Sequence, residues 1–245
     1  MKRIMLTVAY DGTNYHGWQI QKNGETIEGI LNRCLSELLQ EKIEVIGASR
    51  TDSGVHALGN VAVFDTDRRI PAEKFPYALN ARLPEDVKIQ DAREVAPDFH
   101  PRHCESRKTY EYRIYNAPFP MPVKRLYSYF SYTPYNIEAM REAAAYFVGI
   151  HDFKSFCSAD TQVESTVRQV DEVLVEKQED EIVIRVTGRG FLYNMVRIMV
   201  GTLMEVGRGH RLPEEIPQIL EAKERKAAGP TAPACGLTLI KYEFL

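Results

Sequence analysis

Residues 43–65 read IEVIGASRTDSGVHALGNVAVFD and contain two apolar segments, 43–48 and 59–65, separated by a polar turn. Val, Ile and Phe in the apolar segments favour strands, and Ser, Asp and Gly between them favour a turn. Around this pair we predict, in chain order, a strand at 4–10, a helix at 26–40, a helix at 72–81 and a strand at 87–94. The resulting order, strand-helix-strand-strand-helix-strand, is typical of a ferredoxin-like unit.

The same kinds of element recur in the second part of the chain. We predict a strand at 109–116, a helix at 137–148 with Asn136 as N-cap, strands at 166–177 and 181–187, helices at 191–206 and 214–225, and a closing strand at 237–244. The sequence therefore predicts an α/β protein of the α+β type. It is built from two ferredoxin-like halves, 1–103 and 104–245, with mixed or antiparallel sheets.

The composition indicates a globular protein of the cytoplasm. Of the 245 residues, 44% are hydrophobic and 27% are charged. No apolar run approaches the roughly 20 residues that a membrane span needs. The first strand also reaches Asp11-Gly12 too soon for the core of a signal peptide. We therefore expect a cytoplasmic protein with no membrane contact.

The cysteines and histidines do not favour a metal site or a disulfide framework. The four cysteines are scattered without a C-x-x-C pair. His100-x-x-His103-Cys104 imitates part of a metal cluster, but no second ligand pair accompanies it, so a solvated basic segment is the favoured interpretation. Glycine-rich nucleotide loops, the G-x-S-x-G elbow and the zinc signature of deaminases are also absent from the sequence. We predict no metal and no cofactor.

Charge is unevenly distributed along the chain, although the net charge is only −3. Residues 99–125 carry six Lys or Arg against two Glu, and residues 185–211 carry five Arg against one Glu. Acidic residues gather instead in 171–181 and 213–224. Because nucleic-acid binding depends on positive charge meeting phosphates, we expect the basic segments to border one cleft and the acidic segments to face away from it. Ordinary solvated charges are the alternative.

The polar turn within 43–65 carries a candidate for covalent chemistry. Residues two apart at an extended strand end point the same way, so Arg50 and Asp52 are expected to share a face. An arginine beside a carboxylate lowers its pKa and favours the ionised form, which suits a nucleophile better than a general acid. The alternative is a hydrogen-bonded turn residue that merely caps Gly54, because Asp-x-Gly turns are common.

Two further segments are candidates for RNA contact. Residues 107–116 interleave basic and aromatic side chains, a combination that stacks on bases and holds phosphates. Arg107, Lys108 and Tyr110 are therefore candidate contacts, whereas Tyr112 is interpreted as a core residue with a hydrogen-bonded hydroxyl. The loop at 11–21 places Trp18 and Gln19 among polar residues, which suits RNA contact or a plain Asp-Gly turn.

The predicted helix at 191–206 has two unlike sides. Apolar residues fill one half of it, and Asn194, Arg197 and Gly201 lie together outside that half. A glycine inside a helix costs about 1 kcal/mol relative to alanine. We therefore expect that some other group approaches the helix backbone closely at Gly201.

Taken together, these segments resemble the tRNA pseudouridine synthase A family over almost the whole chain. The most specific match is residues 50–57, RTDSGVHA, to the family signature R-T-D-x-G-V-H-A. Four further blocks match in the family's order, and they lie within 10–21, 108–112, 194–201 and 232–237. Ser49 departs from the glycine that many members carry there.

The resemblance implies two ferredoxin-like halves around a central cleft and a homodimer that binds tRNA. It implies isomerisation of uridine to pseudouridine at nucleotides 38–40 of the anticodon stem-loop. Asp52 would be the nucleophile, Tyr110 would pack on the target base, and Arg197 would pair with Asp52. Arg50 would help to hold the extruded nucleotide, and Leu237 would belong to the substrate-binding terminal loop. The isomerisation oxidises nothing and transfers no outside group, so no cofactor is implied.

Two other functions stay open at this point. A non-catalytic RNA-binding protein with a double ferredoxin-like fold would need basic and aromatic surface, but no carboxylate beside Arg50 and Arg197. A carboxylate-dependent hydrolase normally needs a second carboxylate or a base partner, and none accompanies Asp52 in its turn. The residues around Asp52 therefore favour the isomerase.

Overall fold

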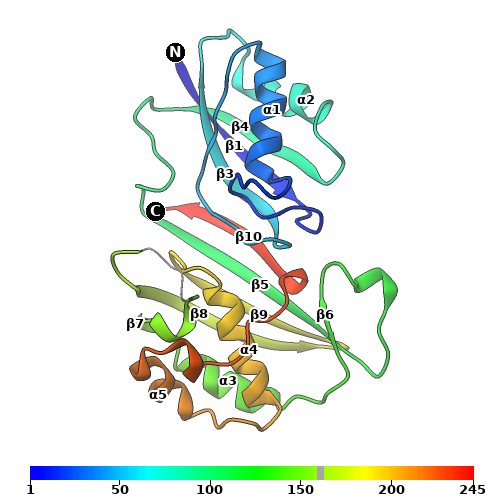
Figure 1. The fold of residues 1–245 in the computed structure, drawn as a ribbon, viewed down its shortest axis with the longest axis vertical. Coiled ribbons are helices and arrows are strands. Elements are labelled where there is room, and N and C mark those ends of the chain that lie inside the picture. The colour runs from blue at the N-terminus through cyan, green and yellow to red at the C-terminus, as the bar shows by residue number, and fades with distance from the viewer. Residues whose placement is uncertain (159–162) are drawn as a thin grey trace. The chain divides into compact units, whose positions relative to one another are not determined.

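The computed structural model describes residues 1–158 and 163–245. Contacts within the chain divide it into two compact units, which are described separately. Unit 1 comprises Met1–Ser106 and Leu239–Leu245, and unit 2 comprises Arg107–Thr238 (Figure 1). Most of the closing strand thus belongs to unit 1, whereas the sequence placed it in the second half.

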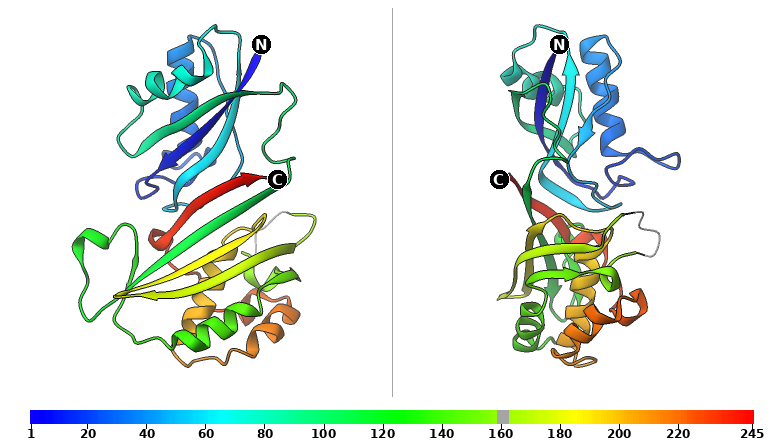
Figure 2. Two further views of the ribbon diagram at one scale, coloured as in Figure 1. Left: turned by 180° about the vertical axis from the view of Figure 1, so that it is seen from behind. Right: turned by 90° about the vertical axis from the view of Figure 1, so that its left-hand side faces the viewer.

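Unit 1 is built on a sheet with strand order β4-β1-β3-β10, with β2 paired to β3. Its strands are β1 Lys2–Tyr10, β2 Ile46–Gly47, β3 His56–Thr66, β4 Val87–Val95 and β10 Leu237–Phe244, and its helices are α1 Ile27–Leu39 and α2 Phe75–Asn80. β1 pairs antiparallel with both β3 and β4. The side view shows α1 covering one face of this sheet (Figure 2).

The two faces of β1 contact different parts of the core, and one face is more completely buried than the other. Alternate residues Ile4, Leu6 and Val8 have no exposed surface. Met5 points to the other face, where it forms a cluster with Ala48, Val61 and Val63, packed by Phe99, Tyr242 and Phe244 among others. The period of two along the strand produces this division.

The predicted strand at 43–48 is wrong over most of its length, because only Ile46–Gly47 pair with a neighbouring strand. The preceding backbone groups bond to side chains of α1 instead. Ser36 Oγ accepts from the amide of Ile43 at 2.9 Å, and Asn32 Oδ1 accepts from the amide of Val45 at 2.8 Å. The segment therefore follows the helix and joins the sheet only at its end.

Unit 2 has the strand order β5-β9-β8-β7, with β6 paired to β5. Its elements are β5 Ser106–Asn116, β6 Tyr129–Ser131, α3 Ile137–Ala145, β7 Gly149–Asp152, β8 Val167–Gln178, β9 Glu181–Arg189, α4 Met195–Gly207 and α5 Glu215–Ala222. The pairing of β5 with β6 is parallel, and β5, β9, β8 and β7 pair antiparallel in turn. The predicted mixed sheet of an α+β protein is thus confirmed, although β6 and β7 were not predicted.

Helix α4 differs from its prediction in two ways. It begins at Met195 instead of residue 191, because Asn194 adopts a left-handed conformation with φ of 60° and ends the preceding turn. It is also buried on nearly every side, so its apolar stripe is not matched by a solvated face. A helix enclosed in this way is fixed by packing on all sides.

Candidate active site

The residues around Asp52 form a turn that neighbouring backbone holds in place. We call residues 49–55 the Asp52 loop. Within it, the carbonyl of Asp52 accepts from the amide of Val55 at 3.1 Å, and Gly54 has φ of 78°. The carbonyl of Tyr15 accepts from Gly54 N at 3.3 Å and from the hydroxyl of Ser53 at 3.2 Å. The turn is therefore anchored at both of its central residues.

Two glycines let the segment 11–18 lie directly against the Asp52 loop. A Cβ added to Gly12 would lie 2.0 Å from the carbonyl oxygen of Val55. One added to Gly17 would lie 2.7 Å from the carbonyl oxygen of Thr51, and Gly17 also has φ of 86°. Any larger side chain at these positions would displace backbone, so the close approach depends on glycine.

Trp18 supports the Asp52 loop from within and offers no surface to RNA. Its backbone amide donates to the carbonyl of Thr51 at 3.0 Å, and its ring has no exposed surface. The ring lies 6.0 Å from that of Tyr10, and a Cβ on Gly47 would approach its Nε1 to 2.1 Å. A fully buried ring cannot stack on a base, so the predicted RNA contact at Trp18 is corrected to a supporting role. Gln19, by contrast, is exposed.

Arg50 and Asp52 lie on the outer side of the loop, as the alternation predicted. Ser49 and Thr51 are buried, whereas Arg50 is exposed and Asp52 is partly exposed. Arg102 lies close to the start of the loop, because its Nε donates to the carbonyl of Gly47 at 2.7 Å. Burial and then the positive charge of Arg50 lower the pKa of Arg102. The two positive charges together favour an anion such as a phosphate near them.

The candidate contacts on β5 of unit 2 divide between core and partly exposed positions. Tyr110 is 8% exposed, and its ring meets the edge of Phe191 at 5.3 Å between centroids. Arg107 and Lys108, which precede it, are partly exposed. Tyr112 is fully buried and donates its hydroxyl to the carbonyl of Pro233 at 2.9 Å, which confirms the core interpretation.

Arg197 is held by the loop that precedes β10. Its Nε donates to the carbonyl of Ala232 at 2.7 Å, and its Nη1 donates to Oδ1 of Asn194 at 2.9 Å. A Cβ on Gly201 would lie 1.8 Å from the carbonyl oxygen of Pro230. The expected close approach at Gly201 is thus confirmed, and the approaching group is the backbone of this loop. Leu237, at the end of the loop, is only 4% exposed.

The acidic segment 171–181 does not face away from the basic segments, so that part of the prediction is wrong. Glu111 accepts from Arg113 and Arg185 at 2.7 Å each, and Glu176 accepts from Arg185 at 2.9 Å. Glu181 accepts from Arg113 at 2.7 Å and from Lys124 at 2.6 Å. We call these six side chains the ion-pair network. The antiparallel register of β5, β8 and β9 brings five of these side chains to one face, and Lys124 joins them from the turn after β5. The linear sequence does not show this proximity.

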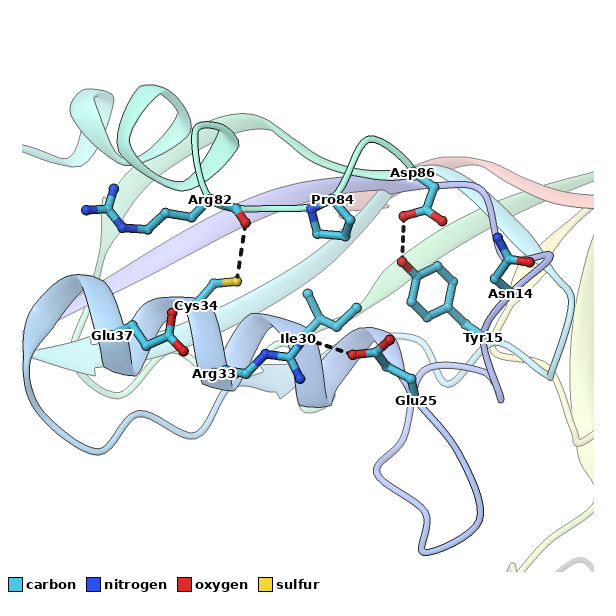
Figure 3. A pocket seen from close by; sticks show the side chains of 10 residues that line it. All are labelled: Asn14, Tyr15, Glu25, Ile30, Arg33, Cys34, Glu37, Arg82, Pro84 and Asp86. Carbon is cyan, nitrogen blue, oxygen red and sulfur yellow. Dashed lines mark hydrogen bonds and ion pairs between the residues drawn. The ribbon is translucent and has the colours of Figure 1, made fainter.

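A pocket of about 510 Å³ in unit 1 lies behind the segment that supports the Asp52 loop (Figure 3). The hydroxyl of Tyr15 donates to Asp86 at 2.5 Å across this pocket, while the carbonyl of the same residue holds the turn. Arg33 pairs with Glu25 at 2.8 Å on the opposite wall. Within this pocket the bond to Asp86 holds the side chain of Tyr15, whose backbone carbonyl anchors the Asp52 loop.

Over the ranges 1–158 and 163–245, no group of three His, Cys, Asp or Glu residues is arranged to hold a metal ion. The rings of His100 and His103 stack at 3.9 Å, and the thiol of Cys104 donates to the carbonyl of His100. No helix within these same ranges combines the length and the apolarity that a membrane span requires.

Sequence reasoning missed two residues that support the Asp52 loop, Tyr10 and Asn60. Both are buried, and both hydrogen-bond to residues of the loop. The available signal was Asn60 itself, a polar residue at the start of the apolar run 61–64. A buried amide in such a position needs hydrogen-bond partners, which directs attention to the neighbouring turn.

Comparison with known proteins gives matches along the full length of the chain. A family model described as tRNA pseudouridine synthase matches residues 6–103 and 143–244. Proteins named tRNA pseudouridine synthase A from Acetivibrio thermocellus and Thermoanaerobacter sp. are 48% and 49% identical over 244 residues, covering 100% of both chains in each case. A chain in a solved Cbf5-Nop10-Gar1 complex aligns with 82% of this chain and 45% of its own length, with 14% identity and a TM-score of 0.36.

Proposed function

This chain belongs to the tRNA pseudouridine synthase family, and on that premise we propose that it isomerises uridine to pseudouridine in tRNA with Asp52 as the nucleophile. The observation that carries the proposal is the Asp52 loop. Its buried residues and bound backbone fix the turn, while Arg50 and Asp52 remain on the outer side. A carboxylate on a fixed backbone beside an arginine suits attack on a bound nucleotide.

The chemistry requires one bond to break and one to form within the same nucleotide. The N1–C1′ bond breaks, the uracil turns, and a C5–C1′ bond forms as the proton on C5 leaves. N1 takes up a proton in exchange, so the composition of the nucleotide is unchanged. Asp52 supplies the electron pair that starts this exchange and recovers it at the end. No electrons are gained or lost overall. A base within a stem must first be flipped out, which costs a few kcal/mol that contacts to the nucleotide must offset.

We assign the remaining candidate residues by their chemistry. Tyr110 packs on the flipped base and assists removal of the C5 proton, and Arg50 holds the extruded nucleotide. Arg107 and Lys108 bind phosphates of the anticodon stem-loop, where nucleotides 38–40 are the proposed targets. The proposed assembly is a homodimer, which doubles the surface that tRNA contacts.

Arg197 is proposed to keep the carboxylate of Asp52 ionised. Loss of an opposite charge raises the pKa of a carboxyl group, so Arg197→Met should shift the acidic limb of the pH–rate profile to higher pH. Arg225→Met is a suitable control, because Arg225 is also a partly exposed arginine of unit 2 that donates to a loop carbonyl, that of Gly229. An unchanged pH–rate profile for Arg197→Met would contradict the proposal that Arg197 keeps Asp52 ionised.

The experiment that tests the proposed function is an assay of purified protein on unmodified tRNA. Formation of pseudouridine without loss or gain of mass supports the proposal. A matched stem-loop containing 5-fluorouridine at the target position separates the two candidate functions, since only a synthase should process or trap it. Binding of both RNAs without reaction on either would favour the non-catalytic RNA-binding protein.

A further inference from the structure

Asn60 on β3 occupies a buried position where every hydrogen-bonding group of its side chain is used. Its Oδ1 accepts from the amides of Ser49 at 3.2 Å and Val61 at 2.9 Å. Its Nδ2 donates to the carbonyl of Ser49 at 2.9 Å and to the hydroxyl of Tyr10 at 3.2 Å. Because backbone amides can only donate, the orientation of the carboxamide is fixed. Asn60 therefore clamps both backbone groups of Ser49.

Tyr10 extends this clamp to the residue next to Asp52. Its hydroxyl accepts from Asn60 and also shares a hydrogen bond of 2.7 Å with Oγ1 of Thr51, in which either hydroxyl can be the donor. Burial raises the pKa of Tyr10 above its ordinary value, so the hydroxyl keeps its proton. The bonds thus run from Asn60 through Tyr10 to Thr51.

Along the loop, residues that are held by these hydrogen bonds alternate with residues whose side chains are exposed or partly exposed. Ser49 is 3% and Thr51 is 7% exposed, and they are hydrogen-bonded to Asn60 and Tyr10, respectively. Arg50 and Asp52 lie on the opposite side. Since neighbouring residues in an extended segment point to opposite sides, fixing Ser49 and Thr51 also sets the direction in which Asp52 leaves the backbone.

We propose that Tyr10 and Asn60 are positioning residues that aim the Asp52 carboxylate at the substrate. The inference rests on the proposed role of Asp52 as nucleophile. A purely apolar support would leave the backbone groups of Ser49 without partners, whereas a carboxamide binds them in one geometry. Because a shift of about 1 Å in a reacting group costs up to ~100-fold in rate, such a support acts on turnover more than on binding.

The test separates kcat from KM in Tyr10→Phe, which removes one hydroxyl and keeps the ring. We expect kcat on unmodified tRNA to fall about tenfold, the factor that ~1.4 kcal/mol of lost hydrogen bonding produces, while KM changes less than about twofold. Tyr135→Phe is the control, because the Tyr135 hydroxyl also bonds to a side-chain hydroxyl, that of Ser131, within unit 2. Equal kcat in both variants at matched folded fraction would overturn the proposal.

Thr51 provides a second test that does not depend on how well Tyr10→Phe folds. Thr51→Val should reproduce the loss of kcat, and Thr51→Ser, which keeps the hydroxyl, should restore most of it. The double variant Tyr10→Phe with Thr51→Val should be no slower than the slower single variant, because both remove one bond. Full additivity, or a Thr51→Ser variant as slow as Thr51→Val, would contradict the proposed chain of bonds.

Failure of this inference is distinguishable from failure of the proposed function. If Asp52→Asn turns over at the wild-type rate, the nucleophile is wrong and the positioning role falls with it. If Asp52→Asn is inactive while Tyr10→Phe and Thr51→Val keep the wild-type kcat, the nucleophile stands and only the positioning role is wrong.

Discussion

The Asp52 loop of unit 1 and the ion-pair network of unit 2 are both polar, but they are stabilised by different interactions. Uncharged groups hold the loop: the carboxamide of Asn60, the hydroxyl of Tyr10 and the carbonyl of Tyr15. Formal charges hold the strand face, where ion pairs of 2.6 to 2.9 Å join Glu111, Glu176 and Glu181 to Arg113, Lys124 and Arg185.

The difference shows which charges are engaged in folding. A carboxylate that is to attack a substrate is best fixed through its backbone, because neutral groups then orient it without competing for its charge. In the network, each carboxylate is bound by two cations or shares one, so these residues stabilise the sheet. Basic residues counted along the sequence therefore overstate the charge that unit 2 offers to RNA.

The largest effect is expected from a substitution that disturbs the close contact between Gly17 and the Asp52 loop. Gly17→Ala places a Cβ against the carbonyl of Thr51 at a residue with φ of 86°, so the loop must shift. We expect turnover on unmodified tRNA to fall on the order of 100-fold. Gly209→Ala is the control, since Gly209 has φ of 76° but nothing within 4 Å of the added Cβ. Gly209→Ala should lose only the stability that its backbone conformation costs, with normal turnover. Equal turnover in the two variants would show that the close contact between Gly17 and Thr51 is not needed for turnover.

A smaller effect is expected from charges outside the ion-pair network. Replacing Arg107 and Lys108 with glutamine should flatten the dependence of log affinity on log salt by about 0.7 to 0.9 for each phosphate that is no longer neutralised. The control replaces Lys223 and Lys226, which are exposed and carry the same charge. Affinity is measured for one tRNA between about 50 and 200 mM salt. Identical slopes for the two double variants would show that Arg107 and Lys108 merely solvate the surface.

The smallest effect concerns stability and pH in the network itself. Burial opposes ionisation of Glu181, but hydrogen bonds from Lys124 and Arg113 outweigh it and hold its pKa below the ordinary value. A lowered folded-state pKa contributes stability above the unfolded value of about 4.3, which is lost as pH falls through the folded value. Glu181→Gln should therefore cost about 1–2 kcal/mol of unfolding free energy at pH 7 and almost nothing well below pH 4.

The matched control for this comparison is Glu179→Gln in the turn between β8 and β9, where the side chain is exposed. Unfolding in denaturant at several pH values measures both variants. A cost for Glu181→Gln that does not change with pH would show that the network stabilises the sheet by packing and not by charge. Turnover at pH 7 should be the same in both variants, since neither residue is among the proposed catalytic or substrate-binding residues.

Local signals in the sequence were sufficient where a few neighbouring residues decide the structure. Thr26 accepts from the amide of Gly29 and begins α1, and Asn136 accepts from the amide of Ala139 and begins α3, as the capping pattern predicted for α3. The outward placement of Arg50 and Asp52 followed in the same way from the alternation of an extended segment.

Interactions between segments that are distant in the sequence could not be predicted from such local signals. Glu111 and Arg185 meet only because β5 and β9 pair in one particular register, with Glu111 directly opposite Arg185. Trp18 resembled an RNA contact because its sequence neighbours are polar, yet Gly47 and Tyr10 enclose its ring. The support of the Asp52 loop by Asn60, eleven residues from Ser49, depends on the same long-range packing.

The role of Asp52 can be tested in a single comparison of turnover and binding. Asp52→Asn keeps the size of the side chain and removes the charge, and Asp67→Asn, at an exposed residue that pairs with the N-terminus, serves as the control. We predict that Asp52→Asn forms no pseudouridine on unmodified tRNA while its melting temperature and tRNA affinity stay close to those of Asp67→Asn. Pseudouridine formation by Asp52→Asn at a rate near that of the control would contradict the assignment of Asp52 as the nucleophile.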